Sequence, residues 1–551
     1  MTELKLPIDI SVVIPVHNVE DYLDDCLDSL HRQSLKTAEF IVVNDGSTDH
    51  CAEVCNKYAR LDKRFIVVHQ ECQGTLIARK RAFELARGKW CICVDGDDYL
   101  PFDTVLEVEV DLANKYDVDI LRFDMSALSE DENAVKNYLN FRKEWVGSIN
   151  TPYEIIREIF EKGTVGWGMA DKIYRTSIVK RAIQSLEDVT LICGTDAYQL
   201  FLVCFYSNSF KSIKTEPFYS YRLGTGISNG KVNIKKFVSQ SQILNIPKFL
   251  TSFVRAQKKY EEYSSIIQKL ITRLVDQTIS RFHKLPLEES FNAFDYLFCN
   301  PEVKLNVLAA LQKFYLKDPA LLARKAANSR LLQLNKRRIK KVGIFYPRLH
   351  NGGVQRVISM QAPLLQEHGL EVVLFTEEVT ENDSVNFPIV VLPRLGDPKR
   401  FKVLDKALVD NMIDLVIYHA SSSSSMLFDL LTIKLCQRYF ILCRHENTTQ
   451  SLTWNSTFFT QFASTYKLAD SLVVLSSMER AYYRSYGIQT FYIPNPFPLS
   501  LNIEHPPSRD SLDRNTESLI LCRPEKKNKS RHLVWIARLE NNQKNYKEAL
   551  E

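Results

Sequence analysis

Residues 90–98 read Trp-Cys-Ile-Cys-Val-Asp-Gly-Asp-Asp, so that five apolar residues run directly into three aspartates and a glycine. A short apolar run of this kind predicts a strand buried on both faces of a sheet. The residues before it, Thr75 to Arg87, have helical spacing, and Gly88 stands where a glycine often ends a helix. This stretch therefore predicts a helix followed by a strand whose end carries concentrated negative charge.

Three earlier segments repeat the apolar pattern and predict further strands of the same sheet. They are Ile10 to Ile14, Phe40 to Val43 and Phe65 to His69. Residues 47–61 read as a helix capped by one of its first three residues. Strands that alternate with helices predict an α/β domain with a mostly parallel sheet.

Polar clusters follow three of the predicted strands at the point where each strand ends. These clusters are His17-Asn18, Asn44-Asp45-Gly46-Ser47 and Asp95-Gly96-Asp97-Asp98. Ligands of such sheets bind beyond the carboxyl ends of the strands. We therefore expect the three clusters to converge on one rim of the sheet.

The acidic cluster has two interpretations. An exposed turn with solvated charges is the simpler one. The other is a metal site, because Gly96 permits a tight turn that lets Asp95 and Asp97 face the same point. Carboxylates on alternate residues suit Mg²⁺ or Mn²⁺, which take few protein ligands and complete their shell with diphosphate and water. Such a cation would neutralise the charge that develops on a departing nucleotide diphosphate.

Two further polar features admit a structural and a functional interpretation. The turn from Asn44 to Asp49 could simply open a helix, or Asn44 and Asp45 could accept hydrogen bonds from a nucleoside. Arg79 could be a solvated charge on its helix, or its guanidinium could bind a diphosphate through paired donors.

Together these motifs resemble the family 2 glycosyltransferases of GT-A fold. The matching segments are Ser11-Val-Val-Ile-Pro-Val-His-Asn18, Val42-Val-Asn-Asp-Gly-Ser-Thr-Asp49, Arg79 with the Ala-rich helix after it, and Val94-Asp-Gly-Asp-Asp-Tyr99. Four motifs in this order are a specific match, dense over residues 8–105 and thinner to about residue 230. The resemblance implies a metal-dependent, inverting transfer from a nucleotide-diphosphate sugar, usually a uridine one.

The resemblance also implies roles for individual residues. Asp95 and Asp97 match the metal ligands, with Asp98 beside them on the acceptor side. The residues implied to bind the nucleotide sugar are Pro15, His17, Asn44, Asp45, Arg79, Asp95, Gly96 and Asp97. His17 departs from the family, in which a tyrosine is more usual near the base, so the nucleotide preference stays open.

An inverting transfer needs a general base that takes the proton of the acceptor hydroxyl. In the family this base is an aspartate well beyond the metal motif, and Asp196 stands at the matching place. Asp188 is the second choice, and a helix N-cap is the structural alternative for Asp196. Trp167 resembles the acceptor-side segment of the family, although a core tryptophan fits its sequence equally well.

The composition excludes other classes of protein. The 551 residues carry 71 Lys+Arg and 66 Asp+Glu, and this near balance gives no case for nucleic-acid binding. The sequence shows neither a leader of signal-peptide type nor the ~18 uninterrupted apolar residues of a membrane helix. We therefore expect a cytoplasmic protein with reduced thiols. The alternative location is the inner face of the cell membrane. Cys51 and Cys55, beside His50, fit buried hydrophobes better than metal ligands.

Residues 231–337 are expected to form a helical connector, because glycine is rare and apolar residues recur at helical spacing. The end of this region, Arg324 to Lys341, is dense in Lys and Arg. A solvated helix face explains that density, and a peripheral contact with anionic lipid is the alternative.

A second α/β part follows, with seven short apolar strands predicted between Val342 and Ile493. Residues 338–500 resemble the N-terminal lobe of family 4 glycosyltransferases of GT-B fold, a Rossmann-like lobe. The resemblance rests on Asn351-Gly-Gly-Val-Gln-Arg-Val357, Ala469-Asp-Ser-Leu-Val-Val-Leu-Ser476, Tyr492-Ile-Pro-Asn-Pro496 and Trp535-Ile-Ala-Arg-Leu539. We expect residues 501–530 to form a linker and residues 531–551 to begin a second lobe that is incomplete. That lobe normally supplies the nucleotide-sugar site, so no activity is assigned to this half.

These features favour an enzyme over two alternatives. The leading hypothesis is a glycosyltransferase in residues 1–230 that adds a sugar to a glycan or polyprenyl-linked acceptor of the cell envelope. The main alternative is a non-catalytic subunit that binds glycan or nucleotide. The Asp95–Asp97 pair and a candidate base make this alternative less favourable than an enzyme. A nucleotidyltransferase also uses paired aspartates, but it needs a glycine-rich, basic loop near the N-terminus to bind a triphosphate. The segment Pro15-Val-His-Asn-Val is neither glycine-rich nor basic in this way.

Overall fold

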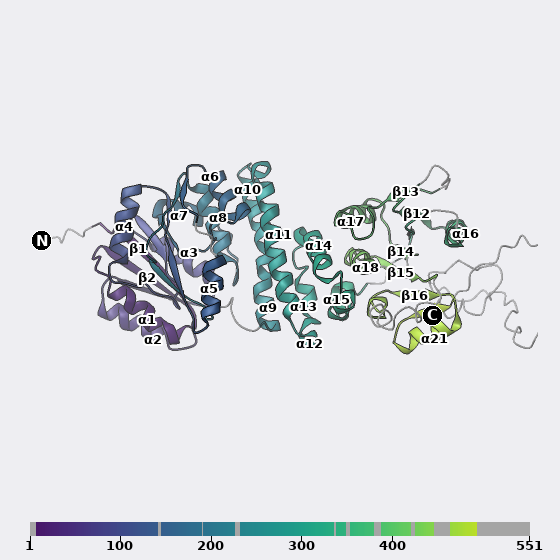
Figure 1. Ribbon diagram of the computed structural model, residues 1–551, viewed down its shortest axis with the longest axis horizontal. Coiled ribbons are helices and arrows are strands. Elements are labelled where there is room, and N and C mark those ends of the chain that lie inside the picture. The colour runs from purple at the N-terminus through teal and green to yellow at the C-terminus, as the bar shows by residue number, and fades with distance from the viewer. Residues whose placement is uncertain are drawn as a thin grey trace, which may run out of the picture. The chain divides into compact units, whose positions relative to one another are not determined.

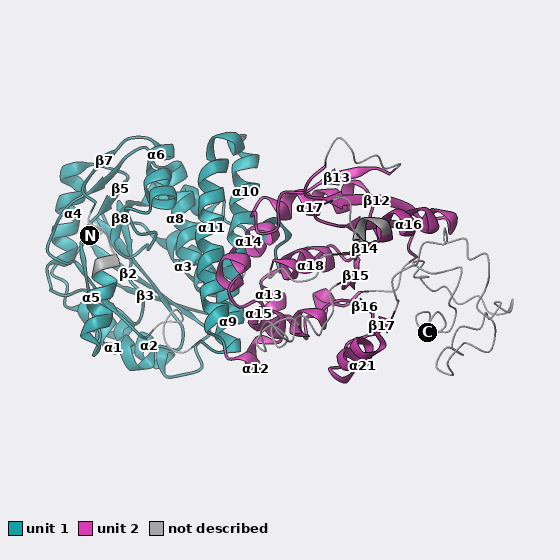
Figure 2. Cartoon of the chain, turned by 45° about the vertical axis from the view of Figure 1, so that its right-hand side comes forward, with its two compact units in different colours: residues 1–285, 299–303 teal, residues 286–298, 304–551 magenta. Residues whose placement is uncertain are grey.

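The computed structural model describes residues 7–141, 145–189, 191–225, 232–334, 338–348, 353–379, 387–419, 425–445 and 463–492. Residue contacts divide the chain into two compact units, residues 1–285 with 299–303 and residues 286–298 with 304–551 (Figure 2). Each unit contains a β-sheet of its own.

Four parallel strands form one half of the sheet in the first unit (Figure 1). In the spatial order β3-β2-β1-β4 they are β3 (Phe65–Gln70), β2 (Ala38–Asp45), β1 (Ile10–Val16) and β4 (Trp90–Cys93). The helices that connect them in sequence are α1 (Glu20–His31), α2 (Cys51–Leu61) and α3 (Thr75–Leu85). The predicted strands and their alternation with helices are confirmed.

The other half of this sheet contains antiparallel pairs, which the sequence did not predict. β8 (Lys172–Arg175) runs antiparallel to both β4 and β5 (Ile120–Arg122). β9 (Phe210–Ser212) and β7 (Gly147–Ile149) complete the eight strands, and β10 (Tyr219–Arg222) pairs with β6 (Met125–Leu128) in a small separate sheet. The helices of this half are α4 (Val105–Tyr116), α5 (Glu132–Phe141), α6 (Pro152–Ile156), the π-helix η1 (Arg157–Lys162), α7 (Thr176–Ile183) and α8 (Thr195–Tyr206). The α/β class is confirmed, with a mixed rather than a mostly parallel sheet.

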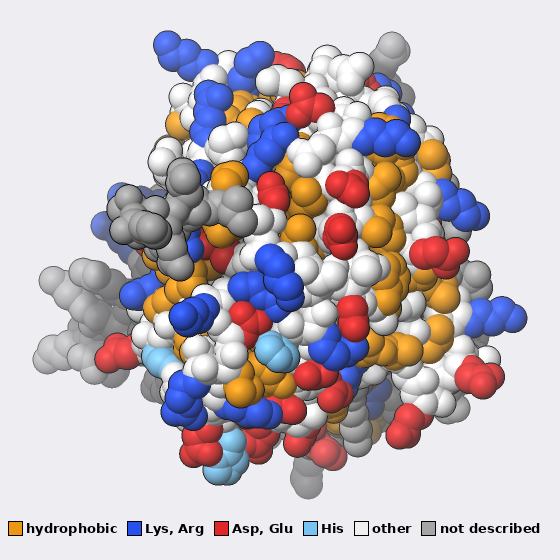
Figure 3. All heavy atoms as spheres, turned by 90° about the vertical axis from the view of Figure 1, so that its left-hand side faces the viewer, with side chains coloured by type: hydrophobic (Ala, Val, Ile, Leu, Met, Phe, Trp, Pro, Cys, Tyr) orange, Lys and Arg blue, Asp and Glu red, His pale blue; other side chains and the backbone are white. Residues whose placement is uncertain are grey.

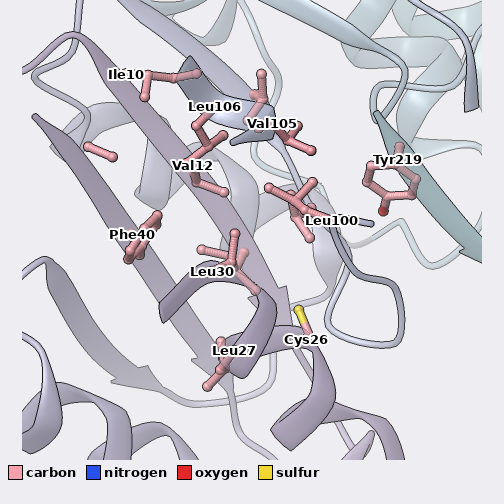
Figure 4. Packing of buried hydrophobic residues seen from close by; sticks show 14 of the residues in the cluster. Ile10, Val12, Cys26, Leu27, Leu30, Phe40, Leu100, Val105, Leu106 and Tyr219 are labelled. Carbon is pink, nitrogen blue, oxygen red and sulfur yellow. The ribbon is translucent and has the colours of Figure 1, made fainter. Parts of the chain in front are cut away.

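A hydrophobic core holds α1 and α4 against one face of this sheet (Figure 4). Leu27 and Leu30 of α1, Phe40 of β2 and Leu106 of α4 are all fully buried in it. Fully burying an aliphatic or aromatic side chain of this kind stabilises the fold by about 1.5–3 kcal/mol. This packing fixes the strands whose carboxyl ends carry the polar clusters.

Two predicted details of helix ends are wrong. Helix α2 begins at Cys51 rather than at Ser47, because the Thr48 N–H donates to Oδ1 of Asn18 (2.8 Å) in the loop after β1. Helix α3 ends at Leu85, before Gly88. A Cβ on Gly88 would lie 2.6 Å from the backbone nitrogen of Ser11, so this glycine allows close packing on β1 rather than ending the helix.

The glycine-poor middle of the chain is helical, as predicted. The first unit holds α9 (Ile234–Ser241), η2 (Gln242–Asn245), α10 (Ile246–Ala256), α11 (Tyr260–Lys284) and η3 (Pro301–Val303). The second unit holds α12 (Leu287–Ser290), α13 (Ala293–Tyr296), α14 (Lys304–Tyr315), α15 (Pro319–Ala326) and η4 (Arg330–Leu332). The division between the compact units therefore falls inside the stretch that was predicted as one connector.

The basic segment from Arg324 to Lys341 does not form one helix face, so that expectation is wrong. Lys325, at the end of α15, is 1% exposed, and its ammonium donates to Oγ of Ser290 (3.1 Å). Burial lowers the pKa of Lys325 to about 8. Lys341 begins a β-strand and pairs with Glu371 (3.0 Å), while residues 335–337 lie outside the described part of the chain.

Seven parallel strands form the sheet of the second unit, and all seven were predicted. They are β11 (Lys341–Phe345), β12 (Glu371–Thr376), β13 (Ile389–Val391), β14 (Leu415–Tyr418), β15 (Tyr439–Cys443), β16 (Ser471–Val474) and β17 (Thr490–Tyr492). Their order is β13-β12-β11-β14-β15-β16-β17, a Rossmann-like arrangement. The helices described with them are α16 (Gly353–Glu367), α17 (Arg400–Asp410), α18 (Met426–Leu435) and α21 (Ser477–Ser485).

Several predicted segments lie outside the described residues. They are the linker at residues 501–530, the start of a second lobe at residues 531–551, and the motif residues Asn351 and Gly352. Among the helices that are described, none combines the length and the apolar character needed to cross a bilayer.

One face of the first unit is shown in Figure 3 with its side chains coloured by type. Lys and Arg are interspersed there with Asp and Glu rather than gathered in a single basic patch. This distribution agrees with the near balance of charges in the sequence.

Candidate active site

The polar clusters after β1 and β2 contact one another directly. Nδ1 of His17 lies 2.7 Å from the carbonyl oxygen of Asp45, and the Asn18 N–H donates to Oγ of Ser47 (3.1 Å). His17 is exposed and Pro15 is half-buried. The structure therefore brings these two predicted clusters together at one edge of the sheet.

Asn44 and Asp45 are both buried at this edge. Oδ1 of Asp45 accepts from Nε2 of Gln70 (2.7 Å) and from the Gln73 N–H (2.8 Å), while Oδ2 accepts from the Gly74 N–H (2.7 Å). Asp45 thus ties the end of β2 to the loop before α3. The nucleoside contacts of Asn44 and Asp45 stay a prediction.

The acidic turn after β4 is closed by a hydrogen bond from the Asp98 N–H to the carbonyl oxygen of Asp95 (3.0 Å). Gly96 has an ordinary backbone conformation, but a Cβ there would lie 3.4 Å from the carbonyl oxygen of Pro15. The turn therefore packs closely on the end of β1, and the backbone conformation does not itself require a glycine. The side chain of Asp95 remains 32% exposed, and Oδ2 of Asp97 accepts from the Thr225 hydroxyl (2.9 Å).

Asp98, by contrast, is buried and anchors the turn to β10. Its Oδ2 accepts from the Tyr219 hydroxyl (2.7 Å), which itself accepts from the Asp95 N–H (3.1 Å). Its Oδ1 accepts from the Arg222 N–H (2.7 Å). Burial, followed by the charges of Asp95 and Asp97, raises the pKa of Asp98 to about 8. A solvated acidic turn is therefore the wrong description of Asp98, and its contact with an acceptor stays a prediction.

The electrostatics of the turn fit a divalent cation. Burial, followed by the charge of Asp95, raises the pKa of Asp97 above its ordinary value. The two carboxylates therefore lie close enough to repel one another, and a bound cation would offset that repulsion. Carboxylate oxygens are the ligands that Mg²⁺ and Mn²⁺ prefer, so the residues present suit either ion.

A second group of side chains within the described residues has the spacing to hold a metal ion. Ligand atoms of His17, Asp45 and Cys72 all lie within 4.8 Å of one another. Cys72 is exposed in the loop after β3, and a Cβ on Gly46 would lie 2.5 Å from its backbone nitrogen. This group contains neither Asp95 nor Asp97, and no sequence pattern singled out Cys72.

Arg79 connects the acidic turn to the predicted base. Its Nη2 donates to Oδ1 of Asp95 (2.7 Å), and its Nη1 donates to Oδ1 of Asp196. Arg79 is only 2% exposed, so its interpretation as a solvated surface charge is wrong. Burial opposes the charged guanidinium, but the charges of Asp196 and Asp95 outweigh that effect and raise the pKa of Arg79.

Asp196 is the second residue of α8, whose N-cap is Gly194, so the structural alternative of Asp196 as the N-cap is wrong. Its Oδ2 accepts from the Met169 N–H (3.3 Å), and its side chain is 32% exposed. Gly168 lies beside this oxygen, and a Cβ on that glycine would be 3.9 Å from it, which is an ordinary contact distance. The second choice, Asp188, is 79% exposed and instead pairs with Lys80 (2.5 Å).

Trp167 is in contact with other side chains on its ring face. The guanidinium carbon of Arg273, from α11, lies 4.4 Å from the centre of the indole ring. Phe160 stacks beside it, with ring centres 6.3 Å apart and planes 19° from parallel. One face of Trp167 is thus covered by the protein, which favours a structural role, and stacking on a sugar stays a prediction.

Sequence analysis missed the residues that hold the acidic turn in place. Tyr219 and Thr225 contact aspartates more than a hundred positions earlier in the chain. Motif spacing carries no information on such distant partners, so only the fold reveals them.

Two family models match this chain. "Glycosyl transferase family 2" matches residues 11–183, and "Glycosyltransferase Family 4" matches residues 351–501. The first match contains His17, Asp45, Arg79 and the acidic turn after β4, and it ends before Asp196.

Curated bacterial proteins are similar to part of the chain. The putative glycosyltransferase EpsH of Bacillus subtilis is 28% identical over 272 residues, which cover 48% of this chain and 74% of EpsH. The putative teichuronic acid biosynthesis glycosyltransferase TuaG of the same species is 37% identical over 90 residues, which cover 16% of this chain and 36% of TuaG. Among solved structures, residues 1–349 of S. aureus TarS in complex with UDP align with a TM-score of 0.39 and 20% identity, over 58% of this chain and 88% of that one.

Proposed function

We propose that the first unit of this chain transfers a sugar from a nucleotide-diphosphate donor. The premise is that the chain carries a family 2 glycosyltransferase domain joined to a family 4 glycosyltransferase region. The donor is a UDP-sugar, and the transfer inverts the anomeric centre. The acceptor is a glycan or a lipid-linked sugar of the cell envelope. The observation that carries the proposal is the buried Arg79, which joins the acidic turn at Asp95 to the candidate base Asp196.

In this proposal Asp95 and Asp97 hold Mn²⁺ or Mg²⁺, which when bound neutralises charge on the departing diphosphate. The contacts of the chain preset the two carboxylates for this task. The Thr225 hydroxyl orients Asp97, and the Tyr219 hydroxyl fixes the backbone of Asp95 against the buried Asp98. Preset ligands lose less conformational freedom when the ion binds.

The nucleoside lies along the rim that the ends of β1 and β2 form. The exposed imidazole of His17 stacks on the base, beside Pro15 and Gly96. Asn44 and Asp45 form hydrogen bonds with the nucleoside. Three donors of the chain already fix the carboxylate of Asp45 in place. A base and ribose bound here would lie within reach of the acidic turn, because β1 lies between β2 and β4.

Asp196 acts as the general base. Arg79 and the Met169 N–H fix the orientation of its carboxylate, and its exposed fraction leaves room for an acceptor hydroxyl. Asp196 takes the hydroxyl proton while the acceptor oxygen forms a bond to the anomeric carbon and the bond to the diphosphate breaks. Attack from the face opposite the diphosphate inverts that carbon.

The cell envelope is proposed as the place of the product because the name of the relative TuaG refers to teichuronic acid biosynthesis. A lipid-linked acceptor would bring the enzyme to the inner face of the membrane. The exposed side chains of Arg324, Arg330, Arg338 and Lys340 supply positive charge for contact with anionic lipid there.

The test is to incubate the purified chain with a panel of nucleotide sugars and Mn²⁺ or Mg²⁺, and to measure released UDP. We expect slow release that requires the metal and that disappears in Asp97→Ala. Asp196→Asn should bind UDP with unchanged affinity in calorimetry but lose transfer, whereas the matched control Asp188→Asn should transfer normally.

Three outcomes would contradict parts of the proposal. Normal transfer by Asp196→Asn would show that another residue is the base. Binding of a nucleotide sugar without release of UDP under any condition would favour the alternative of a non-catalytic binding subunit. Release of UDP at full rate in EDTA would remove the metal from the reaction.

A further inference from the structure

Arg79 is shared between two carboxylates that perform different tasks in the proposed function. It lies on α3, Asp95 lies after β4, and Asp196 lies on α8. Helices α3 and α8 contact one another in the first unit. The guanidinium uses one nitrogen for each carboxylate, with Nη2 on Asp95 (2.7 Å) and Nη1 on Asp196, so neither pairing requires the other to break.

The charges around this guanidinium do not balance. The buried Arg79 faces both Asp95 and Asp196, and Asp97, which Arg222 neighbours, adds a third carboxylate near the first. Arg79 itself stays charged, because an arginine side chain is not deprotonated in proteins. The positive charge that neighbours Asp95 is therefore a permanent feature of the folded chain.

A fixed positive charge next to a metal ligand lowers the affinity of that ligand for a divalent cation. Oδ1 of Asp95 is engaged by Arg79, and a cation on the same carboxylate would lie within a few ångströms of the guanidinium. At the effective dielectric of a partly exposed site, one unit charge at such a distance changes the affinity for a cation by roughly tenfold or more.

The same guanidinium orients the candidate base. Nη1 of Arg79 holds Oδ1 of Asp196, and the Met169 N–H holds Oδ2 (3.3 Å). Gln199 lies beside this contact, with Oε1 3.5 Å from Nη1. Without Arg79 the carboxylate of Asp196 would keep only the weaker contact to the backbone.

We propose that Arg79 is a positioning residue that couples the donor metal to the general base. This inference rests on the proposed function. In the metal-free chain the guanidinium holds both carboxylates at once. A cation on Asp95 would repel the guanidinium and weaken that contact, which leaves Asp196 as its remaining carboxylate partner when the metal-bound donor is present. By thermodynamic linkage, the same repulsion weakens metal binding in the free enzyme.

The test compares Arg79→Met with Arg79→Lys in the full chain. The Mn²⁺ dissociation constant is measured without donor by electron paramagnetic resonance, and the kcat for transfer is measured separately. Arg79→Met should bind Mn²⁺ roughly tenfold more tightly while its kcat falls roughly a hundredfold. Arg79→Lys keeps the charge, so its Mn²⁺ affinity should stay near that of the wild type, with part of kcat restored.

Arg81→Met is the matched control, because Arg81 is an exposed arginine on the same helix. It should change neither quantity, and circular dichroism checks that every variant is folded. Weaker or unchanged Mn²⁺ binding in folded Arg79→Met would overturn the coupling, because a merely structural arginine would not tighten metal binding when removed. If the wild type itself showed no metal-dependent release of UDP, the proposed function would fail instead.

Discussion

A buried glutamate in α4 gives a stability prediction whose size follows from the structure. Glu109 is 1% exposed, and neither of its carboxylate oxygens has a hydrogen-bond partner within the described part of the chain. Burial alone raises the pKa of Glu109 well above its ordinary value of 4.5. The folded chain therefore keeps this proton at pH values where the unfolded chain releases it.

Keeping the proton lowers stability as the pH rises. Between pH 4.5 and the raised pKa of Glu109, the unfolded state is favoured by 1.36 kcal/mol per pH unit, which amounts to at most about 3.4 kcal/mol at pH 7. A glutamine of the same shape needs no proton. We therefore expect Glu109→Gln to raise the free energy of unfolding by up to about 3.4 kcal/mol at pH 7 and by almost nothing below pH 4.5.

The assay is urea unfolding of wild type and variant between pH 4 and pH 8, followed by tryptophan fluorescence. Trp90 and Trp167 both lie in the first unit and report on it. Asp111→Asn is the matched control, since Asp111 is an exposed carboxylate on the same helix and should show no such gain. A Glu109→Gln variant whose advantage did not grow with pH would refute the reasoning, because Glu109 would then have a compensating partner.

Three further substitutions test separate parts of the fold and the site. Gly88→Ala should destabilise the first unit by about 1–3 kcal/mol in urea unfolding, because its Cβ would lie 2.6 Å from a β1 backbone nitrogen. Arg400→Met leaves the buried Asp429 without its charged partner and with only the Tyr418 hydroxyl as a donor, so the second unit should lose about 3–5 kcal/mol while metal-dependent UDP release continues unchanged. Tyr219→Phe removes the hydroxyl that joins the Asp95 N–H to the buried carboxylate, and the rate of UDP release should fall roughly tenfold. Wild-type behaviour in any of the three would contradict the contact on which it rests.

Strands were the part of the fold most open to prediction from the sequence. Apolar, β-branched runs such as Ile10–Ile14 can bury both faces only inside a sheet, so the four parallel strands of the first unit and the seven of the second were predicted, although their spatial order was not. The antiparallel strand β8 was missed because Lys172 and Arg175 interrupt its apolar character. Lys172 is nevertheless buried, since its ammonium donates to the carbonyl oxygens of Gly166 (3.0 Å) and Gly168 (2.6 Å).

The site was predictable where it consists of local motifs and unpredictable where it consists of distant contacts. Polar residues at strand ends placed His17, Asp45 and Asp95 on one edge, because parallel strands share that edge. The pairing of Arg79 with Asp196 joins residues 117 positions apart, and no periodicity encodes it. Burial excluded the solvated alternative for Arg79, because only tertiary contacts show whether a helical arginine faces solvent.

The proposed function depends on the binding of a sugar donor's divalent cation by the acidic turn after β4. A crystal structure of the chain with Mn²⁺ and UDP, in which anomalous scattering locates the manganese, tests this binding. We expect a manganese peak about 2.1 Å from a carboxylate oxygen of Asp95 or Asp97, beside the diphosphate. A peak at His17, Asp45 and Cys72 instead, or no manganese at the acidic turn with UDP bound, would contradict it.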